Sequence, residues 1–348
     1  MIIGVASVDY RDAQWGATGW MRIGQWLPRW SARHTVCVGS LWHHHDHLEI
    51  EVTQPDGTTQ RVAPDVVYLH YYQDDISSLI YRARASGQVV IQDLDDWYWG
   101  IDARHAMWQK TRHNVQSYAA NIAASDLVTT TTPYLADRLA ERFRVEIAVI
   151  PNHIDVTRFS PVDHTVDTPT LGWAGGTDRR GGDLTELKGV LSRCSGRVAF
   201  QHSGHLDGAP LFADEVGLPA DAVRRVDRTT PDRYPELLDF QIGVVPLRNT
   251  PFNDAKSDLK GLEYAASGIP FVASPSAAYR ALAAEWEGCF RLAKRPADWV
   301  KGIEAYLDPA ARAHTAGELR ARVAERDLAR GTPLYLDLFD TLAAGVGV

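Results

Sequence analysis

The chain has few cysteines and none of the long apolar runs that mark a membrane protein. Its 348 residues include three cysteines, Cys37, Cys194 and Cys289, an odd number spread widely along the sequence. This usage argues against a disulfide framework and is typical of unpaired thiols in a reducing compartment. No apolar stretch approaches the roughly 20 residues of a membrane-spanning helix. Met1–Val8 has the pattern of a short strand instead of a signal peptide, so we expect a cytoplasmic protein.

The chain also lacks an excess of basic residues. Asp and Glu outnumber Lys and Arg by 44 to 36, which gives a formal net charge of −8 at pH 7. Binding along duplex DNA normally needs a basic face, so this balance argues against a large nucleic-acid footprint while allowing a local basic groove. The composition, 45% apolar and 23% charged, is that of a soluble globular protein, and the length suffices for two domains.

What the chain does have is a steady alternation of strand-like and helix-like patterns. Such alternation predicts an α/β fold with parallel sheets covered by helices. We expect strands at 2–8, 35–40, 66–70, 88–92, 127–130, 146–150, 170–174, 197–201, 223–226, 242–246 and 270–273. We expect helices at 15–30, with a kink at Pro28, and at 75–86, 111–124, 133–143 and 333–344. The polar stretch 160–168 is the predicted linker between two halves.

Gly243–Ser274 has the most informative pattern, which predicts a strand, a loop, a helix and a second strand. Lys256, Lys260 and Glu263 follow one another at spacings of four and three residues, which places them on one face of the helix. A lysine near the helix start adds to the affinity of that end for an anion such as a diphosphate. The alternative interpretation is a solvated face with weak ion pairs.

Capping residues predict the two ends of this helix. Asn253 is the expected N-cap and Gly268 the expected C-cap, and Pro270 prevents the helix from continuing. Lys256 is therefore expected within the first turn of one continuous helix.

Two segments resemble a known enzyme family. Val149–Pro161, VIPNHIDVTRFSP, resembles the I-P-N-G-V-D-x-x-x-F-x-P segment that closes the first domain of GT-B glycosyltransferases of the family-4 type, with His153 where the family usually has glycine. Gly243–Ser274 resembles the donor-binding helix of that family, including its E-Y/A-x-A-x-G-x-P-x-V-A ending. The family usually has two glutamates eight positions apart, and here Ala255 stands in place of the first.

The resemblance implies a fold, a domain division and a reaction. The fold would be GT-B, with two Rossmann-like domains facing a central cleft: an acceptor domain at 1–158, a nucleotide-sugar donor domain at 159–328, and a helix at 329–348 that crosses back to the first domain. The reaction would transfer a hexosyl or pentosyl group from a UDP- or GDP-type nucleotide sugar to a hydroxyl with retention of configuration. The nucleotide sugar is then a co-substrate, and we expect no metal and no resident cofactor. The oligomeric state is left open.

The resemblance also assigns donor-binding residues. Lys256, together with Arg179 or Arg180, would contact the diphosphate, Glu263 would hold the ribose, and Lys260 is a weaker candidate. His202 ends a predicted strand of the second half, near the donor in the family.

A glycine loop follows the first predicted strand. Gly16, Thr18 and Gly19 lie in it, and a glycine loop at a helix start lets backbone amides approach a phosphate. The alternative is a tight strand–helix turn. The resemblance favours the first interpretation, because the matching loop of the family faces the donor diphosphate.

The segment 92–100, QDLDDWYWG, is a candidate acceptor site at the carboxyl end of a strand. Asp93 is expected to take hydrogens from acceptor hydroxyls, and Trp97 and Trp99 to stack on a sugar or a base. Asp95 and Asp96 join Lys256 in the predicted catalytic set. The alternative is a strand end at which Asp96 caps a helix and the aromatic rings pack in the core.

Histidines are dense at 43–47, HHHDH. Structural zinc usually draws its ligands from separated positions, so we interpret this run as a solvated loop between strands in which two histidines can share an ion opportunistically.

Three phrases, DLDDWYWG, HSGHLDGAP and AKSDLKGLEYAA, resemble glycosyltransferases encoded by bacteriophages of actinobacteria. That resemblance implies host cytoplasm as the location and, as acceptor, a hydroxymethylated DNA base or a virion protein, and thus a role in DNA modification in the first case. Two alternatives stay open: a catalytically idle GT-B-like binding protein, and a GT-B epimerase or phosphorylase.

Overall fold

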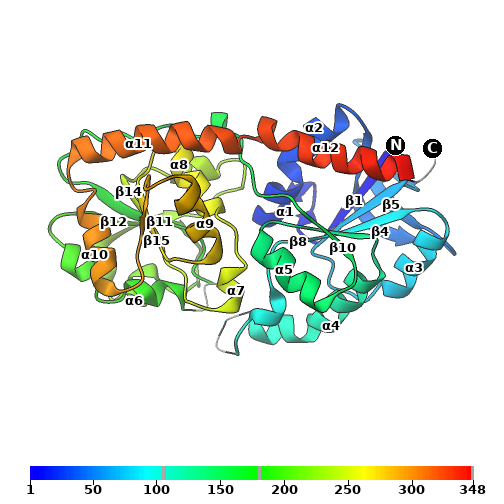
Figure 1. Ribbon diagram of the computed structural model, residues 1–348, viewed down its shortest axis with the longest axis horizontal. Helices are drawn as coiled ribbons and strands as arrows, with labels where there is room; N and C mark the ends of the chain where they lie inside the picture. The colour runs from blue at the N-terminus through cyan, green and yellow to red at the C-terminus, as the bar shows by residue number, and fades with distance from the viewer. Residues whose placement is uncertain (104, 106, 179–181, 346–348) are drawn as a thin grey trace. The chain divides into compact units, whose positions relative to one another are not determined.

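The computed structural model describes residues 1–103, 105, 107–178 and 182–345. The chain divides into two compact units (Figure 1). Unit 1 comprises Met1–Trp99, Lys110–Asn152 and Leu328–Val348, and unit 2 comprises Gly100–Gln109 and His153–Asp327. The halves part at 152/153, six residues before the predicted boundary at 158/159, so the predicted linker 160–168 lies inside unit 2. The last helix leaves unit 2 at 327/328, one residue before the predicted 328/329.

Unit 1 is built on an eight-stranded sheet of order β10-β9-β8-β7-β1-β4-β5-β6. Its strands are β1 (Ile2–Ser7), β4 (Thr35–His43), β5 (Leu48–Thr53), β6 (Thr59–Val62), β7 (Val66–His70), β8 (Val89–Leu94), β9 (Leu127–Thr130) and β10 (Glu146–Val149). All six strands expected in this half are confirmed, and they pair in parallel. The antiparallel strands β5 and β6 were not predicted. β5 alternates apolar and polar residues and β6 is mostly polar and exposed, so neither has the continuous apolar run of a buried parallel strand.

Helices cover this sheet, and a small hairpin precedes them. The helices are α1 (Ala17–Arg22), α2 (Leu27–Ser31), α3 (Ser77–Ala85), α4 (Trp108–Ala124), α5 (Pro133–Arg142) and α12 (Leu328–Gly345), with 3₁₀ turns η1 (Gly24–Trp26) and η2 (Tyr98–Gly100) and the hairpin strands β2 (Tyr10–Arg11) and β3 (Gln14–Trp15). The single kinked helix expected at 15–30 is wrong. The chain leaves helical geometry at Ile23, and Pro28 lies in the first turn of α2, where its missing N–H costs no hydrogen bond.

The C-terminal helix packs on the core of unit 1, as predicted. Tyr335 and Phe339 of α12 lie in one buried cluster with Trp26, Trp30 and Tyr68. The ring centroid of Trp30 lies 4.9 Å from that of Tyr335 and 5.1 Å from that of Phe339. The last helix of the sequence thus completes the core of the first unit.

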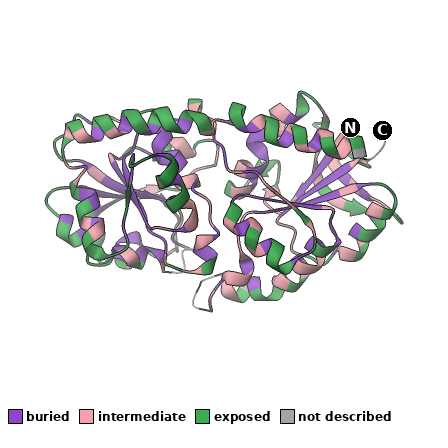
Figure 2. Ribbon diagram, viewed as in Figure 1, coloured by how far each residue is buried: buried purple, intermediate pink, exposed green. Residues whose placement is uncertain are grey.

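Unit 2 is built on a six-stranded, fully parallel sheet of order β13-β12-β11-β14-β15-β16. Its strands are β11 (Thr170–Ala174), β12 (Ala199–His205), β13 (Val223–Asp227), β14 (Ile242–Val245), β15 (Phe271–Ala273) and β16 (Arg291–Leu292). All five predicted strands are confirmed, and only the two-residue β16 was missed. Figure 2 shows buried central strands and helices with exposed outer faces, and the edge strands β13 and β16 are largely exposed.

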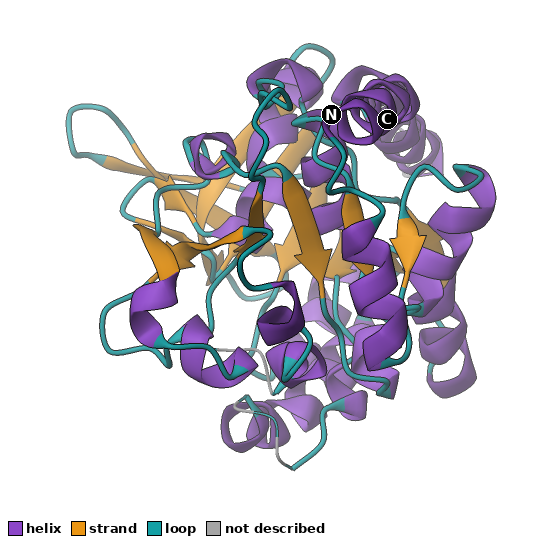
Figure 3. Ribbon diagram, turned by 90° about the vertical axis from the view of Figure 1, so that its left-hand side faces the viewer, coloured by secondary structure: helices purple, strands orange, loops and turns teal. Residues whose placement is uncertain are grey.

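The α-helices of unit 2 are α6 (Phe212–Val216), α7 (Pro251–Asp254), α8 (Leu259–Ala266), α9 (Ala277–Glu285), α10 (Pro296–Glu304) and α11 (Pro309–Val323). The described part of this unit also contains the 3₁₀ turns η3 (Val156–Arg158), η4 (Asp183–Leu187), η5 (Leu191–Cys194), η6 (Ala220–Ala222), η7 (Tyr234–Leu237) and η8 (Ala324–Arg326). Figure 3 shows strands as a central layer with helices on either side. No helix in the described part of the chain is long and apolar enough to span a membrane. All three cysteines are unpaired, as predicted.

Candidate functional site

The carboxyl edge of the unit 2 sheet is the first place to look for a ligand site, because open α/β sheets bind ligands beyond the carboxyl ends of their strands. β11 ends there at Ala174, β12 at His205 and β14 at Val245. The glycine-rich loop Gly175–Gly182 follows β11. Arg179 and Arg180, the predicted phosphate ligands of this loop, lie outside the described residues.

The ends of β11 and β12 touch through their backbones. The Gly175 amide donates to the Ser203 carbonyl oxygen over 2.8 Å. Gly204 has φ +102°, and a Cβ there would lie 3.2 Å from the backbone of Gly175. A side chain at Gly204 would be strained and crowded, so glycine lets the two strands meet under the loop.

His202 supports this loop from the core. Its ring stacks on Trp173, with centroids 5.2 Å apart, and on Phe212, with centroids 5.5 Å apart. Its Nε2 lies 2.9 Å from the Gly175 carbonyl oxygen, and the residue is fully buried. Burial lowers the pKa of the imidazole, which favours the neutral ring that donates to this carbonyl. The predicted contact of His202 with a nucleotide stays a prediction.

The single helix expected for Lys256, Lys260 and Glu263 is wrong. α7 ends at Asp254 and α8 begins at Leu259, so Lys256 lies between two helices. The N-cap of α7 is Thr250, whose Oγ1 accepts from the Asn253 amide over 3.2 Å. Thr250-Pro251 is a strong helix start that was not predicted, and it begins a short separate helix that ends two residues before Lys256.

Lys260 and Glu263 do share α8, one turn apart. The Lys260 ammonium donates to the carbonyl oxygen of Ala174, the last residue of β11, and lies 3.4 Å from the Tyr234 hydroxyl. Glu263 is buried, at 8% exposure. Lys256 instead places its ammonium 4.2 Å from the centroid of the Phe252 ring. The weaker sequence candidate, Lys260, thus reaches the start of the glycine-rich loop.

Arg248 is a cation of this edge that the sequence analysis missed. A Cβ added to Gly182, at the end of the glycine-rich loop, would lie 3.6 Å from Cδ of Arg248. The Arg248 guanidinium lies 3.6 Å from the Asp102 carboxylate. Its backbone amide donates to Asp183 over 3.1 Å. Arg248 follows the predicted strand 242–246 by two residues, so the strand-end rule applied to the first half would have found it here as well.

Asn253 ties these loops together. Its side-chain amide donates to Asp183 over 2.7 Å and to the Arg248 carbonyl oxygen over 2.9 Å. Asn253 was predicted as an N-cap, and it is instead a buried link between the start of η4 and the loop after β14.

In unit 1, Asp9 holds the loop that contains Gly16 and Gly19. Its carboxylate accepts from the Gly19 amide over 2.7 Å, and its carbonyl oxygen accepts from the Gly16 amide over 2.7 Å. A Cβ on Gly16 would lie 2.1 Å from the Asp9 carboxylate. The two amides predicted to bind phosphate are therefore already bonded, and close packing explains the glycines, as in the tight-turn alternative. Thr18 lies in α1, half-buried.

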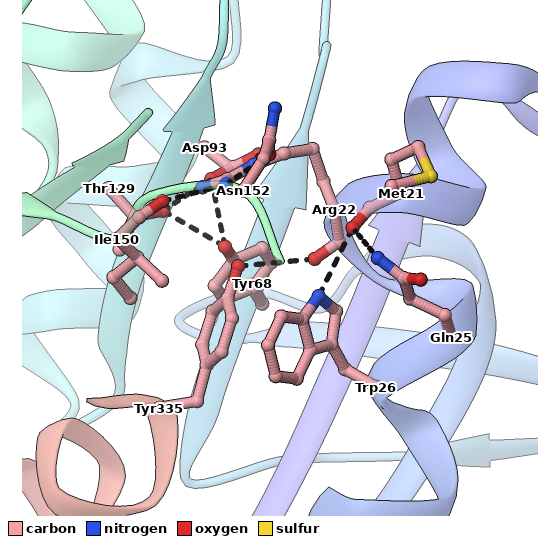
Figure 4. A network of polar contacts seen from close by, with 10 residues as sticks. All are labelled: Met21, Arg22, Gln25, Trp26, Tyr68, Asp93, Thr129, Ile150, Asn152 and Tyr335. Atoms are coloured by element: carbon pink, nitrogen blue, oxygen red, sulfur yellow. Dashed lines mark hydrogen bonds and ion pairs between the residues drawn. The ribbon is translucent and has the colours of Figure 1, made fainter. Parts of the chain in front are cut away.

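Asp93 lies in a buried network (Figure 4). Its carboxylate forms a two-pronged ion pair with Arg22, at 2.7 Å to Nη2 and 3.0 Å to Nε. It also accepts from Tyr68 over 2.9 Å and from Thr129 over 2.6 Å. Because the side chain is fully buried and its oxygens already accept four donors, the predicted acceptor contact of Asp93 has no support in this geometry.

Arg22 links this carboxylate to other parts of unit 1. Its Nη1 donates to the Ile150 carbonyl oxygen over 2.9 Å and to the Asn152 side chain over 3.2 Å. Its own carbonyl oxygen accepts from the Tyr335 hydroxyl over 3.2 Å. One arginine thus joins α1, the ends of β8 and β10, and α12.

The aromatic run after β8 divides between core and surface. Tyr98 is buried and stacks on Tyr118, with centroids 4.9 Å apart and planes inclined by 9°, as in the core alternative. Trp97 and Trp99 are half-buried, with centroids 4.9 Å apart, and Arg142 lies 5.0 Å from the centroid of Trp99.

Asp95 and Asp96, beside these rings, are half-buried too. Trp97, Trp99, Asp95 and Asp96 therefore stay predictions for an acceptor side on unit 1.

Comparison with known proteins supports the architecture. No protein-family model matches the sequence, and no curated protein matches it. The structure is similar to sucrose-phosphate synthase from Thermosynechococcus elongatus, with TM-score 0.72 and 16% identity over 99% of each chain. It is also similar to a glycosyltransferase from Rickettsia africae ESF-5, with TM-score 0.66 and 11% identity over 98% of each chain.

A third similar structure is trehalose-6-phosphate from E. coli bound with UDP-2-fluoro glucose, with TM-score 0.58 and 11% identity over 96% of this chain and 98% of that chain. The chain has the GT-B fold. Its two α/β units are the two domains of that fold, as predicted, and at these identities the likeness concerns the fold alone.

Proposed function

We propose that the protein is a glycosyltransferase whose unit 2 binds a nucleotide-sugar donor of the UDP or GDP type. The observation that carries this proposal is the position of Lys260, at the carboxyl end of β11, with Glu263 one turn further along α8. Arg248 adds a second cation at the far end of the glycine-rich loop. Cations beside a glycine-rich loop suit a diphosphate, and a carboxylate beside them suits ribose hydroxyls.

The rest of the reaction follows from the resemblance to GT-B enzymes of the family-4 type. The sugar passes from the donor to an acceptor hydroxyl with retention of configuration, and the leaving diphosphate helps to deprotonate that hydroxyl. The protein then acts by stabilising the diphosphate charge with Lys260, Lys256 and Arg248, and by orienting the acceptor. Asp95, Asp96, Trp97 and Trp99 are the proposed acceptor contacts on unit 1, and a phage-type hydroxymethylated base or a virion protein is the proposed acceptor.

A second candidate function is a GT-B-like protein that binds a nucleotide sugar without transferring it. Two observations favour it. Ala255, where the family usually has a glutamate, is fully buried and offers no carboxylate for the donor sugar. The Gly16 and Gly19 amides are bonded to Asp9. Donor binding without slow donor hydrolysis would favour this second function.

The test compares three lysine variants of the full chain against a panel of UDP- and GDP-sugars. Binding is measured by calorimetry, and release of the nucleoside diphosphate reports hydrolysis. Lys260→Gln should weaken binding at least about tenfold, roughly 1.4 kcal/mol, because it removes the cation at β11. Lys301→Gln, at an exposed site on α10, is the matched control and should bind like wild type.

Lys256→Glu completes the set, and a loss of binding there would place Lys256 at the diphosphate as well. If no donor of the panel binds wild type, the proposed function fails. If Lys260→Gln and Lys256→Glu both bind like Lys301→Gln, the proposed site is wrong although the function stands. The anomeric configuration of the released or transferred sugar, read by NMR, tests retention.

A further inference from the structure

The hairpin between β4 and β5 presents a cluster of metal-ligand side chains that the proposed function does not use. The two strands pair antiparallel up to His43 and Leu48, which leaves residues 44–47 as the connecting loop. The His44 amide donates to the His47 carbonyl oxygen over 2.9 Å and closes this loop. The expectation of a loop between strands is confirmed, and the closed backbone holds its side chains together.

Three side chains of this loop converge. One ligand atom from each of His44, Asp46 and His47 lies within 4.8 Å of the other two. The ring centroids of His44 and His47 are 5.0 Å apart, and Nδ1 of His47 lies 2.8 Å from the Asp46 carboxylate. Around a tetrahedral zinc ion, bonds of roughly 2.0–2.2 Å place neighbouring ligand atoms about 3.3 Å apart. His44 and Asp46 are exposed, so their side chains can close the remaining gap by rotating in solvent.

A fourth side chain is placed to orient His47. The second ring nitrogen of His47, Nε2, lies 3.3 Å from the Glu49 carboxylate. A metal-binding histidine commonly donates from its other ring nitrogen to a carboxylate, which sets the tautomer and the direction of the ring. When Nε2 of His47 is bonded to Glu49, Nδ1, which faces Asp46, is the ring nitrogen that can bind an ion.

We propose that His44, Asp46 and His47 bind one divalent transition-metal ion of the Zn²⁺ or Ni²⁺ type, with Glu49 as the positioning carboxylate. Two imidazoles and a carboxylate suit this class better than Mg²⁺ or Ca²⁺, which prefer oxygen ligands alone. The ion takes the place between His47 Nδ1 and the Asp46 carboxylate, any proton held on Nδ1 passes to the buffer, and water fills the remaining coordination positions. The bound ion cross-links the loop at the tip of the β4–β5 hairpin, and the site does not depend on the proposed sugar transfer.

The experiment titrates Zn²⁺ and, separately, Ni²⁺ into the untagged, chelator-treated full chain by calorimetry. Wild type should bind one ion with a dissociation constant below about 50 μM. The double variant His44→Ala with His47→Ala should lose that binding at least about tenfold. The matched control is His314→Ala, because His314 and Glu318 form an exposed histidine–carboxylate pair on α11, 3.5 Å apart, and its affinity should equal that of wild type.

Two results would overturn the site: no binding by wild type at about 100 μM ion, or unchanged affinity in the double variant. Circular dichroism and the melting temperature without metal establish that the double variant folds. Should it fail to fold, Glu49→Gln is the second variant. If Glu49→Gln binds one ion at least about tenfold more weakly than wild type, the proposal is supported. Unchanged affinity in this variant contradicts it.

Discussion

Within the described residues, each unit contains an arginine–aspartate pair that is largely shielded from water, and the two pairs differ. In unit 1, Arg22 and Asp93 are 2% and 0% exposed. In unit 2, Arg326 and Asp258 are 14% and 12% exposed, with nitrogen–oxygen distances of 3.1 and 3.2 Å. Asp93 accepts two further hydroxyl hydrogen bonds, from Tyr68 and Thr129, whereas Arg326 supplies the side-chain hydrogen bonds identified for Asp258.

This difference sets opposite pKa directions. Burial raises the pKa of Asp93, but the Arg22 charge and the hydrogen bonds outweigh it, so the pKa of Asp93 is lowered. Burial also raises the pKa of Asp258, and there Arg326 offsets it only in part, so the pKa of Asp258 stays raised. The same pair of residue types therefore stabilises the buried carboxylate in one case and leaves it unfavourable in the other, according to how many donors surround the carboxylate.

The largest effect is expected from breaking the unit 1 pair. Asp93→Asn keeps the shape of the side chain and leaves the Arg22 charge buried without its carboxylate. We expect the free energy of unfolding to fall by about 3–5 kcal/mol, measured by urea denaturation. The matched change Asp258→Asn should cost only about 1 kcal/mol, because it also removes a carboxylate that burial disfavours. Equal losses in the two variants would contradict the comparison.

The pH dependence of stability sharpens the same contrast. The lowered pKa of Asp93 stabilises the fold above its unfolded pKa of about 3.9, and that contribution is lost as the pH falls through the folded pKa. The raised pKa of Asp258 has the opposite effect on stability. The folded state binds the proton at a higher pH than the unfolded state does, so the fold gains stability as the pH falls toward about 3.9.

Unfolding free energies between pH 7 and pH 3 test this. Asp93→Asn should flatten the loss of stability in acid, and Asp258→Asn should begin that loss at higher pH. Curves that stay parallel to wild type in both variants would show that neither carboxyl group shifts on folding.

The smallest effect concerns the edge of the unit 1 network. Tyr335→Phe removes the hydrogen bond from the hydroxyl to the Arg22 carbonyl oxygen and leaves the ring in the core. We expect a loss of about 0.5–1.5 kcal/mol in unfolding free energy. Tyr81→Phe, at a tyrosine that is 54% exposed, is the control and should leave stability unchanged. A loss larger than that of Asp93→Asn would mean that α12, and not the ion pair, holds this core.

Much of the fold follows from local pattern. The buried strands were found because each predicted segment holds a short apolar run bounded by polar turns. β11, β13, β14 and β15 lie within one residue of their predicted bounds, whereas β12 extends four residues beyond its predicted end. The misses have local causes as well. β5 alternates apolar and polar residues and β6 is mostly polar, so neither is a continuous apolar run. Thr250-Pro251 begins a separate short helix, α7, and Lys256 lies between α7 and α8.

The candidate site was less accessible to sequence reasoning. The hydrogen bonds from the Gly16 and Gly19 amides to Asp9 were not expected, because the order of residues does not show which donor an aspartate will bond. Arg248 could have been predicted, because it lies just after a strand. That criterion was applied only to other strands.

By itself, the sequence determined the α/β class, the two halves, the parallel strands and the return of the last helix, because these follow from apolar periodicity and from two long motifs. Only the tertiary structure decided which polar groups are free to meet a ligand. Asp93 pairs with Arg22 across 71 residues, and Lys260 reaches Ala174 across 86. Such contacts form when distant strand ends meet at one edge of a sheet, so their partners are set by packing and not by spacing along the chain.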